Sequence, residues 1–186
     1  MNEKFKNKYR ISSARLQTWD YGNDGAYFIT ICTKYKEHFF GEIVMGESEQ
    51  EMNLNDIGKI ADKYWEEIAS HFPIIELGKY VVMPNHVHGI LIINNPEKIL
   101  TSNSDFNDGK TFGQRRYQNQ GKDTISSIVG SYKSAVTNEI HKFFPDFAWQ
   151  PRFHDHIIRN AESFERIQNY IENNPRNWKE DKFFTK

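Results

Sequence analysis

The chain has 186 residues, of which 38% are hydrophobic, 26% charged and 15% aromatic, and its formal net charge is −1 at pH 7. This length suits one ordinary domain, and the composition excludes collagen-like, mucin-like and wholly disordered classes of protein. No apolar run is long enough to span a bilayer, and Met1 is followed by polar residues rather than by the apolar stretch of a secretory signal. The single cysteine, Cys32, cannot form an internal disulfide, so we expect a cytoplasmic protein with no membrane partner.

The beginning of the chain predicts a basic arm followed by a β-hairpin. We expect an N-terminal arm at residues 1–20, a single domain over residues 21–178 and a polar tail at residues 179–186. Inside the domain, residues 26–33 are β-rich and apolar on both faces, which predicts a central strand. Residues 39–44 are expected to pair with it across a short turn.

The rest of the domain alternates short β-rich runs with segments of helical periodicity. Strands are predicted at residues 74–83, 87–93 and 153–158. Helices are predicted from a cap at Asn53 or Asn55 to about Ser70, from Asp123 or Thr124 to about Phe144, and from a cap at Asn160 over residues 161–173. A long polar loop at about 95–122 has no periodicity, and loops of that length are usually functional or disordered. This order predicts an α+β fold, compatible with an antiparallel sheet covered by helices on one side.

A His-x-His motif opens one of the predicted strands, in the segment Pro84-Asn85-His86-Val87-His88. Side chains two apart on a strand point to the same face, so His86 and His88 could offer two imidazoles to one divalent metal. Val87 would then point into the core. A metal site needs a third ligand, and the alternative is a pair of half-exposed histidines on a sheet edge.

Tyr170 and Asn174 share a face of the last predicted helix because they stand four residues apart. The amide oxygen could complete a metal site, and the phenol beside it could supply a nucleophile. The alternative is that Tyr170 packs at the boundary of the core and that Asn174 ends the helix before Pro175.

A second His-x-His pattern, His154 and His156, allows another interpretation. Combined with the first pair it could form a four-histidine zinc site, although no cysteine supports one. In the alternative interpretation His156 is a hydrogen-bonded core histidine. Cys32, within an apolar strand, is interpreted as an inert core residue.

Charge is distributed unevenly along the chain. Acidic residues dominate Glu37–Glu76, whereas basic residues dominate Lys110–Lys142 and the first fifteen positions. Such segregation permits one basic and one acidic face, and basic residues interleaved with aromatics suit single-stranded nucleic acid. The predicted DNA-binding residues are Arg10, Arg15, Arg115, Arg116, Lys122 and Lys133.

Taken together, these motifs resemble the single-tyrosine histidine–hydrophobe–histidine (HUH) transposases, which are insertion-sequence-200-like, and among them the REP-associated tyrosine transposases. The resemblance rests on VVMPNHVHG at 81–89, HIIRN at 156–160 and Tyr170-Ile171-x-x-Asn174-Pro175. Upstream matches are Arg15-Leu16, Trp19-Asp20-Tyr21, YFITICT at 27–33, Phe40-Gly41-Glu42 and Leu54-Asn55-x-x-Gly58. They extend over nearly the whole chain.

The resemblance implies a fold, a cofactor and a partner. It implies a ferredoxin-like antiparallel sheet of the HUH nuclease type, a divalent Mg or Mn ion, and single-stranded DNA that folds into hairpins. Carried over by position, His86 and His88 match the metal-binding pair, Asn174 the third ligand and Tyr170 the nucleophile. The chain would act as a monomer or a homodimer.

The implied activity is DNA cleavage and strand transfer in transposition, through a 5′-phosphotyrosine intermediate. The metal would stabilise charge on a nonbridging phosphate oxygen while tyrosine attacks phosphorus. Two alternatives remain at this point. One is a non-catalytic regulatory protein that binds hairpin DNA. The other is a metal-dependent hydrolase that uses both histidine pairs.

Overall fold

The structure is a computed structural model that describes residues 21–95, 121 and 123–185. The expected N-terminal arm and nearly all of the expected loop at 95–122 therefore lie outside the described residues. No helix of the described part is long and apolar enough to cross a membrane.

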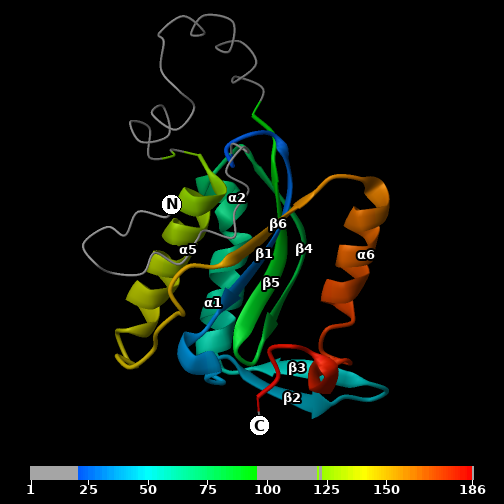
Figure 1. Cartoon of the computed structure of the whole chain (residues 1–186). Helices are drawn as coiled ribbons and strands as arrows, with labels where there is room; N and C mark the ends of the chain where they lie inside the picture. Colours follow the sequence, from blue (N-terminus) through cyan, green and yellow to red (C-terminus); the bar gives the residue numbers. More distant parts are fainter. Residues whose placement is uncertain (1–20, 96–120, 122, 186) are drawn as a thin grey trace, which may run out of the picture.

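A four-stranded antiparallel sheet forms the centre of the domain (Figure 1). Its strands stand in the order β4 (Ile75–Met83), β5 (His86–Ile93), β1 (Gly25–Cys32) and β6 (His154–Ile158). β4 and β5 form a hairpin, β1 pairs with β5 on one edge, and β6 pairs with the other edge of β1. The structure confirms the α+β class with an antiparallel sheet.

Helices cover both faces of this sheet, so the expectation of helices on one side is wrong. Helices α1 (Asp56–Glu66), α2 (Ile68–His71) and α5 (Ile125–Ile140) lie on one face, and α6 (Ala161–Glu172) lies on the other (Figure 1). The strand period of two explains why. Alternate residues of β1 and β5, such as Ile29 and Leu91, enter the main core, while Ile90 packs with Ile167 of α6.

The strand expected at residues 39–44 does not pair with β1. Instead β2 (Gly41–Met45) pairs with β3 (Gln50–Leu54) in a separate two-stranded sheet. A strand has only two edges, and both edges of β1 are already occupied by β5 and β6. β3 is not predicted because its sequence, QEMNL, has too few apolar residues to stand out as a strand.

The expected helix starts are confirmed by their caps. Asn55 accepts a hydrogen bond from the Gly58 N–H at 2.9 Å, and Asn160 accepts one from the Ser163 N–H at 2.8 Å. Thr124 begins α5 with a capping box shared with Ser127. The helix expected to reach about Ser70 is divided at Glu67 into α1, which ends at Glu66, and α2, which ends at His71. Helix α5 ends at Ile140, earlier than expected.

Close packing at Gly89 gives a stability prediction. A Cβ atom there would lie 2.2 Å from Cζ2 of Trp65, which is fully buried, so Gly89→Ala should lower the free energy of unfolding by ~1–3 kcal/mol. Gly130 on α5 is the matched control, since a Cβ atom added there would meet nothing within 4 Å. Gly130→Ala should raise the free energy of unfolding by ~0.5–1 kcal/mol. Urea denaturation measures both, and equal effects of the two substitutions would contradict the packing described.

Candidate active site

His86 and His88 lie side by side on β5, on the sheet face that α6 covers. Both side chains are 0% exposed, and their ring centroids are 4.3 Å apart. The alternative of half-exposed histidines on a sheet edge is wrong, because β5 is an interior strand with partners on both sides. Val87 points to the opposite face and joins the main core, as expected.

Asn85 fixes the orientation and the tautomer of His86. Its Nδ2 donates hydrogen bonds to the carbonyl oxygens of Phe183 at 2.9 Å and Lys36 at 3.2 Å. Its Oδ1, which can only accept, is 2.8 Å from Nδ1 of His86, so that ring nitrogen carries the proton. The Nε2 atom of His86 is therefore left with a free lone pair, and it is buried without a hydrogen-bond partner in the described part of the chain.

His88 is held in a similar way by the neighbouring strand. Thr30 stands opposite it in the β1–β5 register, and the Thr30 Oγ1 lies 2.8 Å from Nδ1 of His88. That contact directs Nε2 of His88 toward α6, where it lies 3.2 Å from the hydroxyl of Tyr170. Both histidines thus use Nδ1 for anchoring and turn Nε2 toward the same space.

Burial keeps both imidazoles neutral. It lowers the pKa of His86 to about 3, with a further lowering from the positive charges of Lys182 and Lys36. Burial also lowers the pKa of His88 well below its usual value, helped by the neighbouring His86. Neutral imidazole is the form that binds metal ions, so the pair is ready for ligation at pH 7.

The structure brings Tyr170 and Asn174 to the same place as the histidines. Tyr170 reaches His88 from α6, and Asn174 follows one turn later, where its backbone N–H donates to the carbonyl of Ile171 at 3.3 Å. Asn174 is 1% exposed, and its Oδ1 is buried without a hydrogen-bond partner. Tyr170 is 39% exposed, so this residue lies partly at the surface while its hydroxyl contacts His88 and Asp181.

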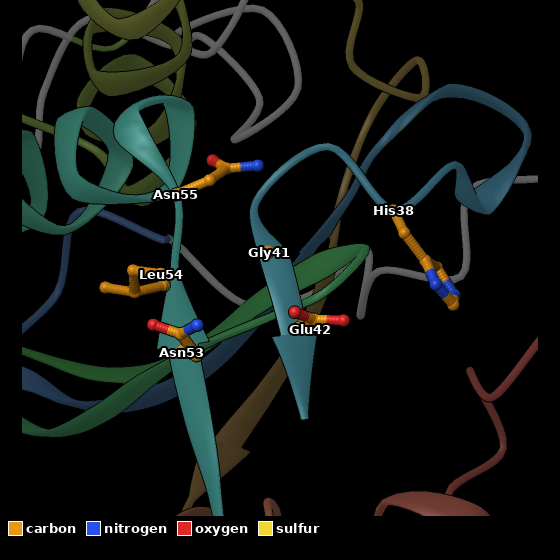
Figure 2. A pocket seen from close by; sticks show the side chains of 6 residues that line it. All are labelled: His38, Gly41, Glu42, Asn53, Leu54 and Asn55. Carbon is orange, nitrogen blue, oxygen red and sulfur yellow. The ribbon is translucent and has the colours of Figure 1, made fainter. Parts of the chain in front are cut away.

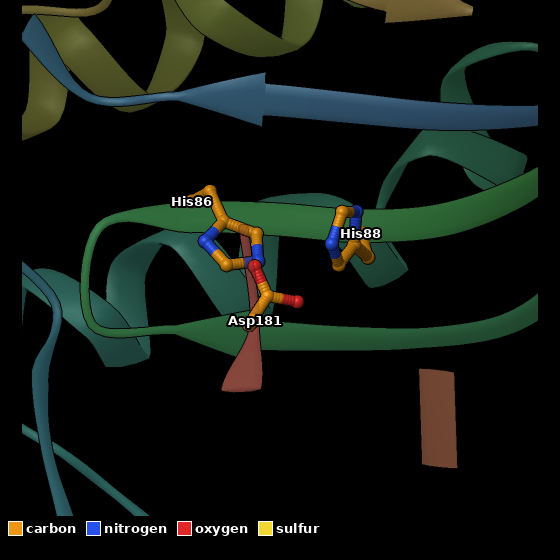
Figure 3. A group of neighbouring side chains, drawn as sticks. All are labelled: His86, His88 and Asp181. Atoms are coloured by element: carbon orange, nitrogen blue, oxygen red, sulfur yellow. The ribbon is translucent and has the colours of Figure 1, made fainter. Parts of the chain in front are cut away.

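Asp181 is a further member of the site, and no pattern in the sequence points to it. Its Oδ2 accepts hydrogen bonds from the Tyr170 hydroxyl at 2.7 Å and from Nδ2 of Asn174 at 2.8 Å. Figure 3 shows its carboxylate pointing toward the two histidines from the C-terminal segment. This segment is anchored by the buried rings of Trp178 and Phe183.

The carboxylate and the phenol influence each other's protonation. Burial raises the pKa of Asp181, but hydrogen bonds from Tyr170, the Phe183 N–H and Asn174 outweigh it and lower the pKa overall. Burial raises the pKa of Tyr170, and the hydrogen bond to Asp181 raises it further. At neutral pH the site therefore holds an ionised carboxylate against a neutral phenol.

These side chains form a group that could hold a divalent cation. One potential ligand atom from each of His86, His88 and Asp181 lies within 4.8 Å of the others. Among the described residues, the buried Nε2 of His86 and Oδ1 of Asn174 find no hydrogen-bond partner, and a buried polar atom without a partner is costly. A cation bound by this group would satisfy Nε2 of His86, and Asn174 adjoins the group through the hydrogen bond of its Nδ2 to Asp181, so the residues present fit a metal ion. A mixture of imidazole and oxygen ligands suits several divalent metals.

The second histidine pair does not join this group. His154 and His156 are exposed on the edge strand β6, and among the described residues the candidate metal ligands do not include them. The four-histidine zinc site is therefore wrong, and so is the interpretation of His156 as a core histidine. Cys32 is buried, which raises the pKa of its thiol to about 11 and agrees with an inert residue.

Most of the predicted DNA-binding residues lie outside the described residues, namely Arg10, Arg15, Arg115, Arg116 and Lys122. Lys133 is described, and its ammonium donates hydrogen bonds to the carbonyl oxygens of Gln150 at 2.8 Å and Arg152 at 3.0 Å. Its part in DNA binding stays a prediction.

A shallow hollow lies elsewhere, where β2 begins and β3 ends (Figure 2). It is lined by His38, Gly41, Glu42, Asn53, Leu54 and Asn55. None of the residues of the candidate site lines this hollow. The carboxylate of Glu42 makes it unsuited to a phosphate group.

Comparisons with known proteins support the fold. The chain is 37% identical over 174 residues to an uncharacterized protein of Haemophilus influenzae, and the match covers 92% of each chain. A REP-associated tyrosine transposase, solved bound to a REP hairpin, superposes with a TM-score of 0.54 at 20% identity, over 90% of this chain and 72% of that chain. A candidate transposase from Deinococcus radiodurans R1 gives a TM-score of 0.45 at 18% identity, over 86% of this chain and 95% of that one. No protein-family model matches the chain.

The buried histidine predicts how stability depends on pH in the metal-free protein. Because the pKa of His86 is about 3 in the folded state and about 6.5 when unfolded, the unfolded state binds more protons as pH falls below 6.5. The stability that this neutral histidine contributes is complete above about pH 6.5 and is lost as pH falls toward 3. In His86→Gln, the acid-induced loss of unfolding free energy should be smaller by on the order of 2–5 kcal/mol. Urea titrations in EDTA across this range measure the slopes, and equal slopes for the two proteins would contradict a buried neutral His86.

Proposed function

The chain belongs to one family with the Haemophilus influenzae protein and has the fold of a REP-associated tyrosine transposase, and on this basis we propose that it is a metal-dependent tyrosine transposase. It would cleave single-stranded DNA that folds into hairpins and transfer the cut strand through a 5′-phosphotyrosine. The observation that carries the proposal is the meeting of a partly exposed tyrosine with four residues that carry potential metal-ligand atoms. The hydroxyl of Tyr170 lies 3.2 Å from Nε2 of His88.

The metal would be held by residues from three segments of the chain. We assign His86 and His88 of β5, Asn174 after α6, and Asp181 of the C-terminal segment as its ligands. When bound there, Mg²⁺ or Mn²⁺ would supply positive charge that stabilises a nonbridging phosphate oxygen and the phenolate form of tyrosine. The neutral imidazoles need no deprotonation before they bind, because burial has already lowered their pKa values.

Tyr170 would carry the covalent step. Its Oη attacks phosphorus and forms the O–P bond of a 5′-phosphotyrosine, while the bond from phosphorus to the 3′ oxygen breaks. The 3′ oxygen takes up a proton and leaves as a hydroxyl, and the hydroxyl proton of Tyr170 is lost. Asp181 already accepts the hydrogen bond from this hydroxyl at 2.7 Å, so it is the acceptor nearest to the departing proton. Attack by a 3′ hydroxyl on the phosphotyrosine reverses the step and completes strand transfer.

Hairpin DNA is proposed as the substrate because the solved relative by fold was bound to a REP hairpin. The position of Tyr170 supports an extended strand as the reacting part, since 39% of this residue is exposed beside the buried His86, His88 and Asn174. A non-catalytic protein that only binds hairpins would not need buried ligand atoms such as Nε2 of His86 and Oδ1 of Asn174, which have no hydrogen-bond partner among the described residues.

Removal of the nucleophile tests the covalent step. Tyr170→Phe keeps the aromatic ring, which contacts Phe28 edge-on, and removes only the hydroxyl. With labelled hairpin oligonucleotides and Mg²⁺ or Mn²⁺, DNA binding should be retained while cleavage and the covalent adduct on a denaturing gel disappear. Tyr64→Phe is the matched control, since this half-buried tyrosine on α1 donates to Glu139, away from the site, and it should cleave normally. Normal cleavage by Tyr170→Phe would remove Tyr170 from the mechanism.

Removal of the imidazoles tests the metal site independently of cleavage. Replacing His86 and His88 together by Ala should abolish both cleavage and saturable Mn²⁺ binding, measured by calorimetry, while circular dichroism shows a folded domain. Replacing the exposed His154 and His156 by Ala should leave Mn²⁺ binding intact. If the first double variant still bound Mn²⁺ and cleaved DNA, the histidines of β5 would be structural.

A further inference from the structure

The turn after β1 holds an exposed aromatic ring in a strained backbone conformation. Tyr35 has φ 56° and ψ 15°, and Lys36 follows with φ 58°, so two successive residues other than glycine adopt the left-handed region. This conformation is costly for side chains larger than Asn or Gly. Tyr35 is 81% exposed, the largest exposed fraction of any large hydrophobic residue in the described part of the chain. Strain of this kind persists only where the surroundings impose it, and it gathers at functional sites.

The surroundings that impose the conformation belong to the candidate active site. The carbonyl of Lys36 accepts hydrogen bonds from Nδ2 of Asn85 at 3.2 Å and from Oγ1 of Thr185 at 3.3 Å. Asn85 is fully buried, and it is the residue that orients His86. Thr33 closes the turn with its hydroxyl on the carbonyl of Glu37 at 2.7 Å. The turn is therefore rigidly joined to the strand that carries the histidines.

One ammonium group lies at the exposed ring, and two more lie at the ring of Phe183 beside the histidines. The ammonium of Lys34 lies 5.1 Å from the centre of the Tyr35 ring. The ammonium groups of Lys36 and Lys182 lie 5.3 Å and 4.8 Å from the ring of Phe183, which in turn lies 4.8 Å from the ring of His86. The turn after β1 and the C-terminal segment are joined by the ammonium of Lys36, which donates to the carbonyl of Lys182 at 3.1 Å, and both segments lie at the end of the sheet where β5 begins (Figure 1).

We propose that Tyr35, with Lys34, Lys36 and Lys182, is a binding site for single-stranded DNA next to the active site, in which a base stacks on the tyrosine ring and the lysines contact phosphates. Stacking on an aromatic ring combined with cationic contacts to the backbone is how proteins bind single strands without reading sequence. The imposed turn keeps the ring away from the core, where an apolar ring would otherwise pack. The inference rests on the proposed function for its partner, and it adds a subsite outside the basic segments that the charge pattern of the sequence singles out.

The test measures binding without cleavage. The probe is a fluorescein-labelled single strand of mixed sequence, about twelve nucleotides long, followed by anisotropy in EDTA. Tyr35→Asn removes the ring, and Asn tolerates the left-handed turn, so the variant should fold. It should bind about tenfold more weakly than the wild type, whereas Tyr35→Phe, which keeps the ring, should bind within about twofold of it. Met45→Asn, at a residue 77% exposed at the end of β2, is the matched control and should bind as the wild type does.

A second probe separates stacking from charge. On an oligonucleotide of the same length that lacks bases, Tyr35→Asn and the wild type should bind equally, because only phosphates remain to be contacted. Lys36→Gln and Lys182→Gln should weaken binding of both probes, and each should reduce the slope of log affinity against log salt by about 0.7. Circular dichroism verifies that each variant folds. If Tyr35→Asn does not fold, Tyr35→Gly replaces it in both binding measurements.

The outcomes distinguish this inference from the proposed function. Wild-type affinity of Tyr35→Asn for the base-containing probe would overturn the stacking site even if hairpin cleavage proceeds normally. An equal loss on the probe without bases would overturn it as well, because the ring would then act only through the turn. Failure of the wild type to bind either single strands or hairpins would overturn the proposed substrate itself.

Discussion

One buried amide, Asn85, joins the parts of the molecule on which the candidate site depends. Its oxygen accepts a hydrogen bond from His86, and its nitrogen donates to the carbonyl oxygens of the turn after β1 and of the C-terminal segment. Because a buried amide left without partners is costly, these hydrogen bonds favour the observed arrangement of the three segments. The tautomer of His86, the strained turn at Tyr35 and the docking of the segment that carries Asp181 therefore depend on the same few hydrogen bonds.

Because side chains alternate along a strand, one face of the sheet carries core residues and the other face carries the candidate site. One set of alternating residues on β5, including Val87 and Leu91, packs into the main core against the helices α1 and α5. The other set begins with His86 and His88 and faces α6. Gly89 lets the ring of Trp65 approach the strand directly behind the histidines. The two imidazoles are thus backed by a densely packed layer, which keeps these candidate ligands in place at a site that has unsatisfied polar atoms.

Sequence patterns predict the parts of this site that obey a local period. A spacing of two on a strand places His86 with His88, and a spacing of four places Tyr170 with Asn174, so both pairs could be predicted. The α+β class could be predicted as well, because the periodicity of each segment identifies it as a strand or a helix, and the order of these elements then indicates the class. Asp181 could not be predicted, because it lies in a segment without periodicity and reaches the site only through the burial of Trp178 and Phe183. The pairing of β2 with β3, and the placement of α6 on the opposite face, depend on which strand edges and faces remain free, which is a property of the assembled sheet.

The order of the site's segments along the chain has a consequence for synthesis on the ribosome. His86 and His88 are made well before Tyr170, and Asp181 emerges later still, after the helix α6 and the strand β6 that completes the sheet. A nascent chain can therefore fold β1, β4 and β5 around their core while it still lacks the proposed nucleophile and the carboxylate beside it. A polypeptide that ends before α6 lacks Tyr170 and Asp181 and could not cut DNA by the mechanism proposed. Incomplete chains on the ribosome would therefore be unable to break DNA strands.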